Sequence, residues 1–512
     1  MTDFAPETTP ATLPAALGFH AARRPDDAFL ISPASHGEAE RILSFSACAR
    51  QMTRYAHALV SLGVSRGDRV AVRLTKSPDA ILLFLAITRV GATYVPINPD
   101  FTAREAQVLI EDSQPVLVID NDEATRSALA QQKIRAMAFG TGTADDLAAI
   151  EADAALPQID ANDHAVMLFT SGTTGRPKGA PLTHANLLTN VASLASAWGF
   201  TQDDRLLHVL PVFHGHGLFL GVTMPVLVGA SVILLPKFDA AETIRLMPQA
   251  SVFMAVPAIY TRLLDRPEFT VETCRSLRLS TSGSAALSPE LFRELQQRMG
   301  LTVVERYGLT ETCILTSNPI DGSARVGSVG RPLSCVELQI AGENDEPLPA
   351  NSVGRVQVRG GSIIDHYWQR PDRGQDWTAE GWFRTGDMGR IDDDGFVWLV
   401  GREKDLIITG GYNVYPREVE IQIETWPGVA EAVVFGVPHP DFGEGVMAAI
   451  KPEPGATLDL AGIEEGIAAG LSKYKRPKRI VVVEEFPRNA MGKVLKTELR
   501  RIHADAFAKV TS

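Results

Sequence analysis

Residues 170–179 combine hydroxyl side chains, glycines and a lysine in a way that suits phosphate binding. Glycines allow the backbone to close around an anion, hydroxyls donate hydrogen bonds to its oxygens, and a lysine supplies positive charge. The residues expected to bind phosphate are Thr170, Ser171, Gly172, Thr173, Thr174, Gly175 and Lys178. A glycine- and threonine-rich surface turn is the alternative that composition alone leaves open.

This segment is not a Walker loop. A Walker loop has four residues between its glycines and then Gly-Lys-Ser/Thr. Here Gly172 and Gly175 are closer together, and Lys178 is followed by Gly179. The sequence therefore predicts a phosphate site of another kind.

The elements that would position this segment alternate between strands and helices. Predicted strands are residues 69–73, 93–96, 114–120, 230–235, 251–255 and 277–281. An apolar helix is predicted over residues 77–90, and the next residue, Gly91, is expected to end it. Such alternation indicates parallel sheets covered by helices on both faces.

Beyond about residue 324 the pattern changes to short strands punctuated by glycine, such as residues 353–360 and 395–400. We place a domain boundary in the charged segment that follows, so that residues 1–402 form a large domain and residues 403–512 a small one. The predicted fold class is α/β, with helix-covered sheets and a small barrel-like part in the large domain. A hinge would connect this domain to an α+β C-terminal domain.

Composition limits the possible partners. A net charge of −12 argues against nucleic acid, and four cysteines without a CxxC pair suit a reducing compartment and give no support for a metal site. Residues 218–236 carry no charge, but their glycines and proline favour a buried helix and strand over a membrane span. We therefore expect a cytoplasmic protein, a monomer or weak homodimer, with no nucleic-acid or membrane partner.

Three further segments group charged, aromatic and glycine residues. They are residues 306–311 (RYGLTE), 381–387 (GWFRTGD) and 487–493 (PRNAMGK). Together with the glycine- and threonine-rich segment, in this order and at these separations, they resemble the adenylate-forming acyl-CoA synthetases. The resemblance covers nearly the whole chain. It implies a ligase that uses ATP to convert an acid to an acyl-adenylate and then transfers the acyl group to coenzyme A.

The resemblance also implies which residues perform the first step. Lys493 would bridge the attacking carboxylate and the α-phosphate of ATP, where cations must offset the repulsion between two anions. Glu311 and Thr170 would hold Mg²⁺, which prefers carboxylate, hydroxyl and phosphate oxygens. His214 is a further catalytic candidate. The alternative for Lys493 is an ordinary surface lysine in a loop.

Other residues are implied to bind the nucleotide. Thr170 and Thr310 would contact the phosphates, and Tyr307 would lie on the adenine face unless it is simply part of the core. Asp387 would accept hydrogen bonds from the ribose hydroxyls, with Arg402 as a nearby cation. Nucleotide contacts are also assigned to Ser284, Ala285, Glu305, Arg306 and Gly308.

In the family the small domain rotates between the two half-reactions, and Lys404 matches the hinge position. The pantetheine arm of coenzyme A would pass Gly410, Gly411 and Tyr412. Arg476, in a basic stretch over residues 473–479, is a candidate for the phosphates of coenzyme A, although a solvated helix face explains the stretch equally well. Asn413 stands where some relatives carry an arginine, which leaves the phosphate contacts of the second step open.

The acid is predicted from charged residues near the expected acyl pocket. His214 and His216 stand where this pocket should open, and Arg278 precedes the segment that contains Gly283. A satisfied core histidine and a surface arginine are the alternatives. An unpaired buried guanidinium is costly, so an arginine in the pocket requires an anion, and the second carboxylate of a short dicarboxylic acid would supply it.

Several segments, among them residues 236–239, 256–260 and 410–416, resemble malonyl-CoA synthetases in particular. Malonate is therefore the expected acid. Methylmalonate differs by one methyl group, worth about 1–3 kcal/mol in a pocket, and stays open as a poorer substrate. Related ligases for oxalate or for a short or medium-chain monocarboxylic acid, and a loader of a separate carrier protein, are the rival hypotheses.

Overall fold

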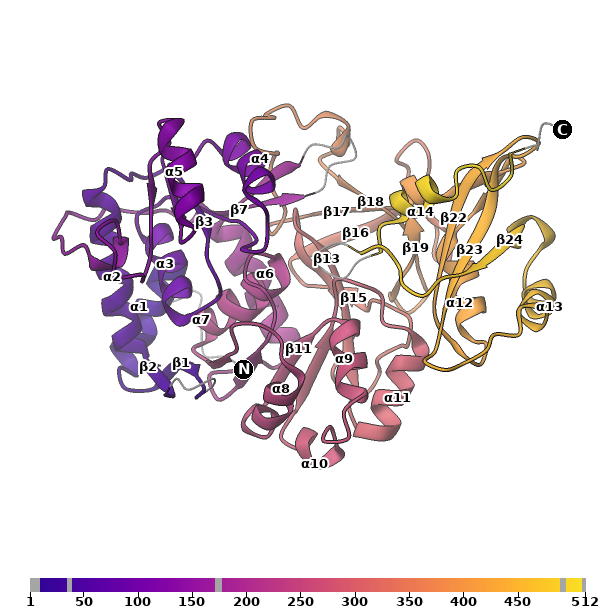
Figure 1. The fold of residues 1–512 in the computed structure, drawn as a ribbon, viewed down its shortest axis with the longest axis horizontal. Coiled ribbons are helices and arrows are strands. Elements are labelled where there is room, and N and C mark those ends of the chain that lie inside the picture. The colour runs from indigo at the N-terminus through magenta and orange to yellow at the C-terminus, as the bar shows by residue number, and fades with distance from the viewer. Residues whose placement is uncertain (1–9, 35–38, 171–176, 489–493, 509–512) are drawn as a thin grey trace.

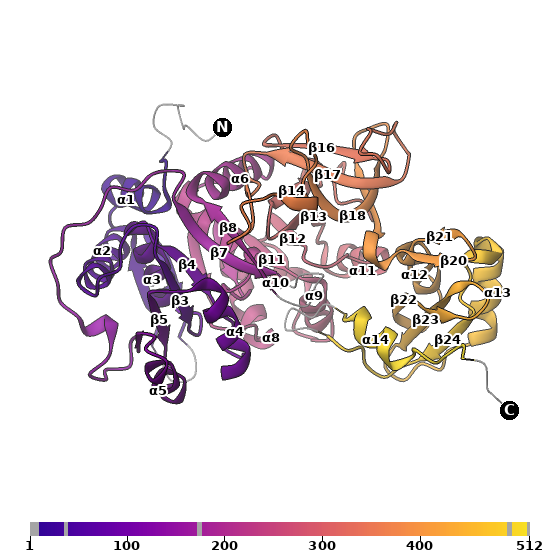
Figure 2. The ribbon, with the colours of Figure 1, turned by 90° about the horizontal axis from the view of Figure 1, so that it is seen from above.

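The computed structural model describes residues 10–34, 39–170, 177–488 and 494–508. Two large sheets with helices on and between them precede a small antiparallel sheet, and the C-terminal residues form a lobe at one end of the molecule (Figures 1 and 2). The predicted α/β class, with a large N-terminal part and a small C-terminal one, is confirmed. In the described part of the chain, no helix has the length and apolar character needed to cross a membrane.

The first sheet has six strands in the order β6-β5-β3-β4-β7-β8. Its strands are β3 (Arg69–Arg73), β4 (Thr93–Pro96), β5 (Leu117–Asp120), β6 (Ala136–Met137), β7 (His164–Thr170) and β8 (Lys178–Thr183). Neighbours are parallel except β7 and β8, which pair antiparallel. The predicted phosphate-binding segment therefore connects two paired strands, with Thr170 at the end of one and Lys178 at the start of the other.

The second sheet has nine strands in the order β15-β14-β13-β12-β11-β9-β10-β1-β2. Its strands are β1 (Ala28–Ser32), β2 (Arg41–Ser44), β9 (Arg205–His208), β10 (Ser231–Leu234), β11 (Val252–Ala255), β12 (Leu279–Ser282), β13 (Val303–Leu309), β14 (Cys313–Ser317) and β15 (Arg331–Pro332). The six strands from β13 to β1 in this order are parallel, so their carboxyl ends lie along one edge.

Helices cover and separate the two sheets. Those of the large part are α1 (Leu13–Arg23), α2 (Phe45–Ser61), α3 (Pro78–Arg89), α4 (Ala103–Ser113), α5 (Glu123–Gln131), α6 (His184–Ala197), α7 (Met224–Val228), α8 (Ala240–Leu246), α9 (Pro257–Leu264), α10 (Val271–Cys274) and α11 (Pro289–Met299), with short 3₁₀ turns η1 (Leu147–Ala149) and η3 (Met247–Gln249). Helices α3 and α6 contact strands of both sheets. The apolar sequence of α3 follows from this position, because a helix between two sheets is buried on every side.

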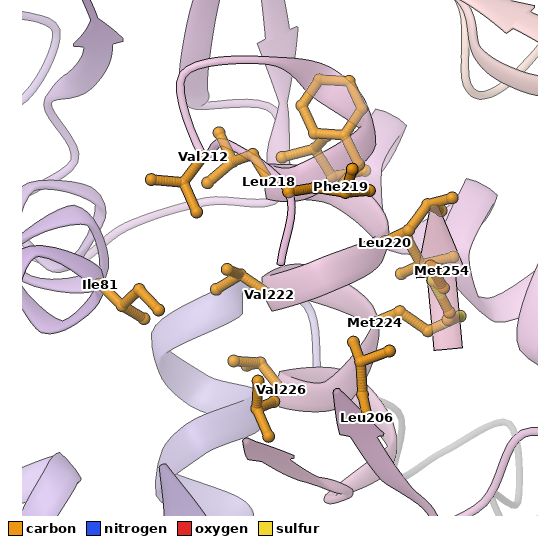
Figure 3. Close-up of a cluster of buried hydrophobic side chains, with 14 of the residues drawn as sticks. Ile81, Leu206, Val212, Leu218, Phe219, Leu220, Val222, Met224, Val226 and Met254 are labelled. Atoms are coloured by element: carbon orange, nitrogen blue, oxygen red, sulfur yellow. The ribbon is translucent and has the colours of Figure 1, made fainter. Parts of the chain in front are cut away.

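The uncharged segment after β9 forms a π-helix, η2 (His216–Thr223), that continues into α7 and ends at Gly229. Figure 3 shows side chains of η2 packed with Ile81 of α3, Leu206 of β9 and Met254 of β11. The predicted helix that stops at Gly229 is therefore present, and its first two turns are wider than an α-helix. π-helical turns are rare and often occur at functional sites.

The small antiparallel sheet and the C-terminal lobe complete the chain. Their strands are β16 (Val336–Ala341), β17 (Gly354–Gly360), β18 (Phe383–Ile391), β19 (Val397–Arg402), β20 (Ile407–Thr409), β21 (Tyr412–Val414), β22 (Val429–His439), β23 (Gly443–Pro452) and β24 (Arg479–Val482). Their helices are α12 (Pro416–Glu424), α13 (Leu460–Gly470) and α14 (Lys496–Ile502), with 3₁₀ turns η4 (Gly374–Asp376), η5 (Glu403–Asp405) and η6 (Lys473–Lys475). The basic stretch forms η6 and β24, so the alternative of a solvated helix face is wrong.

The largest hydrophobic cluster ends at Val397, and the clusters of the C-terminal lobe begin at Ile407. The predicted boundary between residues 402 and 403 falls between them. This boundary stays a prediction.

Gly217, at the start of η2, allows a close backbone approach. A Cβ atom at this position would lie 2.0 Å from the carbonyl oxygen of Pro211, which cannot move as a flexible side chain can. We expect Gly217→Ala to lower the apparent Tm by at least about 5 °C, because the loop before η2 must shift. Gly18→Ala in α1 is the control, since a Cβ there meets nothing within 4 Å and should leave the Tm unchanged or slightly higher. Equal Tm values for both variants would contradict this packing.

Candidate active site

The carboxyl ends of β9, β12 and β13 lie along one edge of the nine-stranded sheet. β12 is followed by Gly283 and Ser284, and β9 by a loop that leads to His216. Ser284 has a positive φ of 69°, a backbone conformation that is costly for a residue with a side chain and is often found at functional sites. Because ligands of open α/β sheets bind outside the carboxyl ends of parallel strands, this edge is the candidate site.

Arg306, on β13, is the most unusual charge at this edge. Its side chain is 5% exposed, and its Nε and one terminal nitrogen have no hydrogen-bond partner among the described residues. A Cβ on Gly283 would lie 2.4 Å from the central carbon of the guanidinium, so only glycine allows this approach. Burial lowers the pKa of Arg306 to about 9, which still leaves the group charged at neutral pH.

Two histidines lie close enough to Arg306 for its charge to act on them. Burial, assisted by the Arg306 charge, lowers the pKa of His214 to about 4, and burial also lowers the pKa of His216 well below its usual value. The backbone N–H of His216 donates to Nδ1 of His214 over 3.5 Å, and Nδ1 of His216 lies 3.3 Å from the hydroxyl of Ser284. Both imidazoles are therefore neutral at pH 7 and add dipoles rather than charge.

The structure places Arg278 elsewhere, and the prediction that it lines the acid pocket is wrong. Arg278 precedes β12, so it lies at the opposite edge of the sheet from Gly283. Its Nε donates to Asp204 over 2.7 Å, and a second nitrogen pairs with the same carboxylate. Its remaining donors bind the carbonyl oxygens of Trp198 and Gly199. Arg278 is thus a structural ion-pair partner of a buried aspartate.

The predicted ribose site does come together. The hydroxyl of Tyr307 donates to one carboxylate oxygen of Asp387, and Nε of Arg402 lies 2.7 Å from the other. Asp387 is 5% exposed and belongs to β18, while Arg402 ends the adjacent strand β19. Burial and the Asp387 charge raise the pKa of the Tyr307 phenol, so it stays a hydrogen-bond donor.

A second cluster lies around Tyr367. Its hydroxyl donates to Oε1 of Glu311 over 2.8 Å, and the ammonium of Lys178 lies 4.6 Å from the centre of its ring. The same ammonium forms an ion pair of 2.9 Å with Asp376. Tyr367 thus connects the carboxylate predicted to bind a metal with the lysine predicted to bind phosphate.

A family model described as "AMP-binding enzyme" matches residues 18–368, and one described as "AMP-binding enzyme C-terminal domain" matches residues 418–493. The chain belongs to the AMP-binding enzyme family. The predicted resemblance to adenylate-forming enzymes is confirmed.

Individual relatives agree with this assignment. The crystal structure of ATP-bound MatB from Rhodopseudomonas palustris is 40% identical, covers 97% of this chain and 99% of its own, and superposes with a TM-score of 0.91. Indoleacetate–CoA ligase from Aromatoleum aromaticum is 34% identical, over 91% of this chain and 94% of the relative. Oxalate–CoA ligase from Arabidopsis thaliana is 34% identical, over 89% of this chain and 91% of the relative. The chain is thus an acid–CoA ligase that binds ATP, within a family whose acids differ widely.

The phosphate segment is only partly described. Thr170 lies at the end of β7, where its hydroxyl is 3.5 Å from the carbonyl oxygen of Lys178. Ser171, Gly172, Thr173, Thr174 and Gly175 lie outside the described residues, as does Lys493. Their predicted roles stay predictions.

The remaining nucleotide candidates lie on or beside β13. Gly308 is required there, because a Cβ would lie 2.0 Å from the carbonyl oxygen of Cys313. Glu305 is buried and accepts a hydrogen bond of 3.0 Å from the backbone N–H of Leu287, so it anchors the segment that carries Ser284 and Ala285. Burial raises the pKa of Glu305 to about 7. Thr310 is half-buried beside Glu311.

The Mg²⁺ prediction fits the donors present. Among the described residues no group of three histidine, cysteine or acidic side chains could hold a metal by itself. Mg²⁺ commonly binds through one or two protein oxygens together with substrate phosphates. Glu311 and Thr170 therefore suit a cation that arrives with ATP.

In the C-terminal lobe, Gly410 and Gly411 form the turn between β20 and β21 with φ values of 59° and 82°. Tyr412 follows, 59% exposed, and its ring stacks on Tyr474 with 4.7 Å between centroids. The guanidinium of Arg476 donates to the carbonyl oxygens of Leu471 and Ala468 at the end of α13, and its predicted contact with the phosphates of coenzyme A stays a prediction. Lys404, the predicted hinge residue, is exposed on η5.

Sequence reasoning missed two residues of this site. Tyr367 and Asp376 lie in a segment that matches no element predicted from periodicity. The sequence around these two residues gives only a weak indication of function. A tyrosine before a tryptophan, and an aspartate in a loop, are common in proteins of any kind.

Tyr367→Phe tests the Glu311 contact, because it removes the hydroxyl and keeps the ring under Lys178. We expect kcat/KM for ATP to fall about tenfold, and the affinity for Mn²⁺–ATP to fall by a similar factor in calorimetry. Tyr55→Phe is the control, since Tyr55 also donates to a carboxylate, that of Asp79 over 3.0 Å, but away from the site. If Tyr367→Phe binds Mn²⁺–ATP as the wild type does, Tyr367 does not orient Glu311.

Proposed function

We propose that the chain converts malonate and coenzyme A to malonyl-CoA, AMP and pyrophosphate through a malonyl-adenylate, with methylmalonate as a poorer substrate. The observation that carries this proposal is the buried guanidinium of Arg306 at the carboxyl edge of the sheet, two of whose nitrogens have no acceptor among the described residues. The sequence resemblance to malonyl-CoA synthetases supports the same acid.

A buried guanidinium without a counter-charge is costly, and the cost falls only when an anion pairs with it. An aliphatic or aromatic acid would leave Arg306 unpaired, whereas the distal carboxylate of a short dicarboxylic acid can accept two parallel hydrogen bonds from it. Nε2 of His216, which has no partner in the part of the chain that the structure describes, would supply a further polar contact. We therefore assign the binding of the distal carboxylate to Arg306 instead of Arg278.

In the first half-reaction the reacting carboxylate of malonate attacks the α-phosphorus of ATP. An oxygen–phosphorus bond forms, and the bond to the pyrophosphate leaving group breaks. Lys493 would stabilise the negative charge between the two reactants, while Lys178 and the hydroxyls that follow Thr170 would hold the phosphates. Mg²⁺ bound by Glu311 and Thr170 would offset the charge on the departing pyrophosphate.

In the second half-reaction the thiol of coenzyme A attacks the acyl carbon, and AMP leaves. Rotation of the C-terminal lobe about Lys404 would bring Gly410 and Gly411 to the pantetheine arm. Glycine suits this role because it allows close backbone approach. Because Arg476 is partly engaged at the end of α13, we assign the phosphates of coenzyme A to Arg476 together with its exposed neighbours Lys473 and Lys478. The C-terminal lobe would thus adopt one orientation for adenylate formation and another for thioester formation.

Pyrophosphate exchange tests the acid directly. Exchange is measured with oxalate, malonate, methylmalonate, succinate, acetate and octanoate at equal concentrations. We expect malonate to give the highest kcat/KM and methylmalonate the next. Highest exchange with acetate or octanoate would contradict the proposal, and failure to form a thioester with free coenzyme A would favour a carrier-protein loader.

The variants Arg306→Met and Arg278→Met distinguish the proposed acid-binding role of Arg306 from the structural role of Arg278. We expect Arg306→Met to raise the malonate KM at least about 100-fold with little change in the ATP KM, because the distal carboxylate loses its charge partner. Arg278→Met should lower the apparent Tm, because Asp204 is left buried without its cation, and should leave the malonate KM within about twofold. A selective rise in malonate KM only in Arg278→Met would restore the original assignment.

Lys493→Ala tests the two half-reactions. The lysine serves only the first, so we expect adenylate formation to fall at least about 1,000-fold while thioester formation from supplied malonyl-adenylate stays within about threefold. The measurement compares pyrophosphate exchange with single-turnover malonyl-CoA formation. Equal loss in both would refute the assignment of Lys493 to the first step.

A further inference from the structure

Lys76 is a buried cation that the assigned chemistry does not use. It lies two residues before α3, and its side chain is 5% exposed. Its ammonium donates to the carbonyl oxygen of Leu210 over 2.7 Å, to that of His208 over 3.1 Å, and to Nδ1 of His208 over 3.4 Å. No carboxylate pairs with it in the part of the chain that the structure describes.

The three acceptors match the three N–H groups of an ammonium. Such burial is costly, and an apolar side chain of similar length would fill the same volume without that cost. Burial lowers the pKa of Lys76. A lysine at this position is therefore best explained by what its hydrogen bonds hold in place.

The hydrogen bonds of Lys76 hold both ends of one loop. At the start of this loop Lys76 binds the carbonyl oxygens of His208 and Leu210 directly. At its end, Nε2 of His208 donates to the carbonyl oxygen of Gly217 over 2.9 Å, which leaves Nδ1 of His208 as the acceptor for Lys76. Residues 209–216, the histidine loop, are thus closed at their base by Lys76 and His208.

The elements around the histidine loop leave it little freedom. A Cβ on Gly221 would lie 2.2 Å from Nε2 of His208, so the imidazole packs directly on the backbone of η2. On its other sides η2 is held by Ile81, Leu206 and Met254 (Figure 3). A change in the hydrogen bonds of Lys76 must therefore be taken up by residues 209–215 rather than by η2, which begins at His216.

The histidine loop carries His214 and His216, which lie close enough to Arg306 for its charge to act on them. We propose that Lys76 is a positioning residue for recognition of the distal carboxylate, because it fixes the loop that forms one wall of the Arg306 pocket. This inference rests on the proposed function. It assigns acid specificity to a residue that precedes α3 and lies outside the segments from which the site was predicted.

Lys76→Met and Lys76→Gln test this role in the full-length enzyme by pyrophosphate exchange. Methionine removes all three hydrogen bonds, and the glutamine amide keeps two donors for the carbonyl oxygens. We expect Lys76→Met to raise the malonate KM about tenfold or more, Lys76→Gln to raise it less, and the ATP KM to stay within about twofold in both. Rates are normalised to active sites by the burst of pyrophosphate, so that loss of folded protein does not affect the KM values.

Arg89→Met is the matched control, because Arg89 lies on α3 and also donates to a backbone carbonyl, that of Pro157 over 2.8 Å, away from the histidine loop. It should leave both KM values unchanged. A malonate KM within twofold of the wild type in Lys76→Met, or an equal rise in the KM for ATP, would overturn the inference. If Lys76→Met does not fold, Lys76→Leu, which also removes all three hydrogen bonds, is judged by the same criteria.

The wild type separates this inference from the proposed function. Malonate and butyrate are compared in the same assay. A preference of the wild type for butyrate would overturn the proposed function and, with it, the role of Lys76. A preference for malonate together with an unchanged malonate KM in Lys76→Met would overturn the role of Lys76 alone.

Discussion

A positive charge held inside a protein requires a partner, and the acid pocket depends on that constraint. Arg306 is buried against Gly283, next to two neutral histidines, with donors that no described residue accepts. Other buried cations in the chain have local acceptors, as Arg73 has in Asp120 and Lys76 in two carbonyl oxygens. We therefore propose that the substrate supplies the partner of Arg306, so that charge at the far end of the acid would be the basis of selection.

The sheet explains how residues distant in sequence meet around this charge. Parallel strands end at one edge, so the turn after β12, the motif on β13 and the loop after β9 converge there. The nucleotide groups lie nearby, with Tyr307 on β13 bound to Asp387 of the small antiparallel sheet. One strand, β13, thus contributes both the arginine proposed for the acid and the tyrosine proposed for the nucleotide.

Much of the fold was predictable because alternating apolar strands and helices leave a local signal, and β3 and β4 have the predicted bounds. The proximity of Asp387 and Arg402 was predictable from motifs. The acid pocket was not: Arg278 precedes its strand and so belongs to the opposite edge, and its partner Asp204 is distant in sequence. Arg306 was recognised within its motif but assigned to the nucleotide, because sequence does not show which way a side chain points. The roles of Lys76 and Tyr367 depend on contacts with loops that are remote in sequence. Hydrophobic periodicity does not predict such contacts.

The central claim is that a charge at the distal end of the acid selects the substrate. The most direct measurement compares malonate with its monomethyl ester in pyrophosphate exchange by the wild-type enzyme, because the ester keeps the reacting carboxylate and neutralises the distal one. We expect kcat/KM for malonate to exceed that for the ester at least about 100-fold. Equal values, or a preference for the ester, would contradict it.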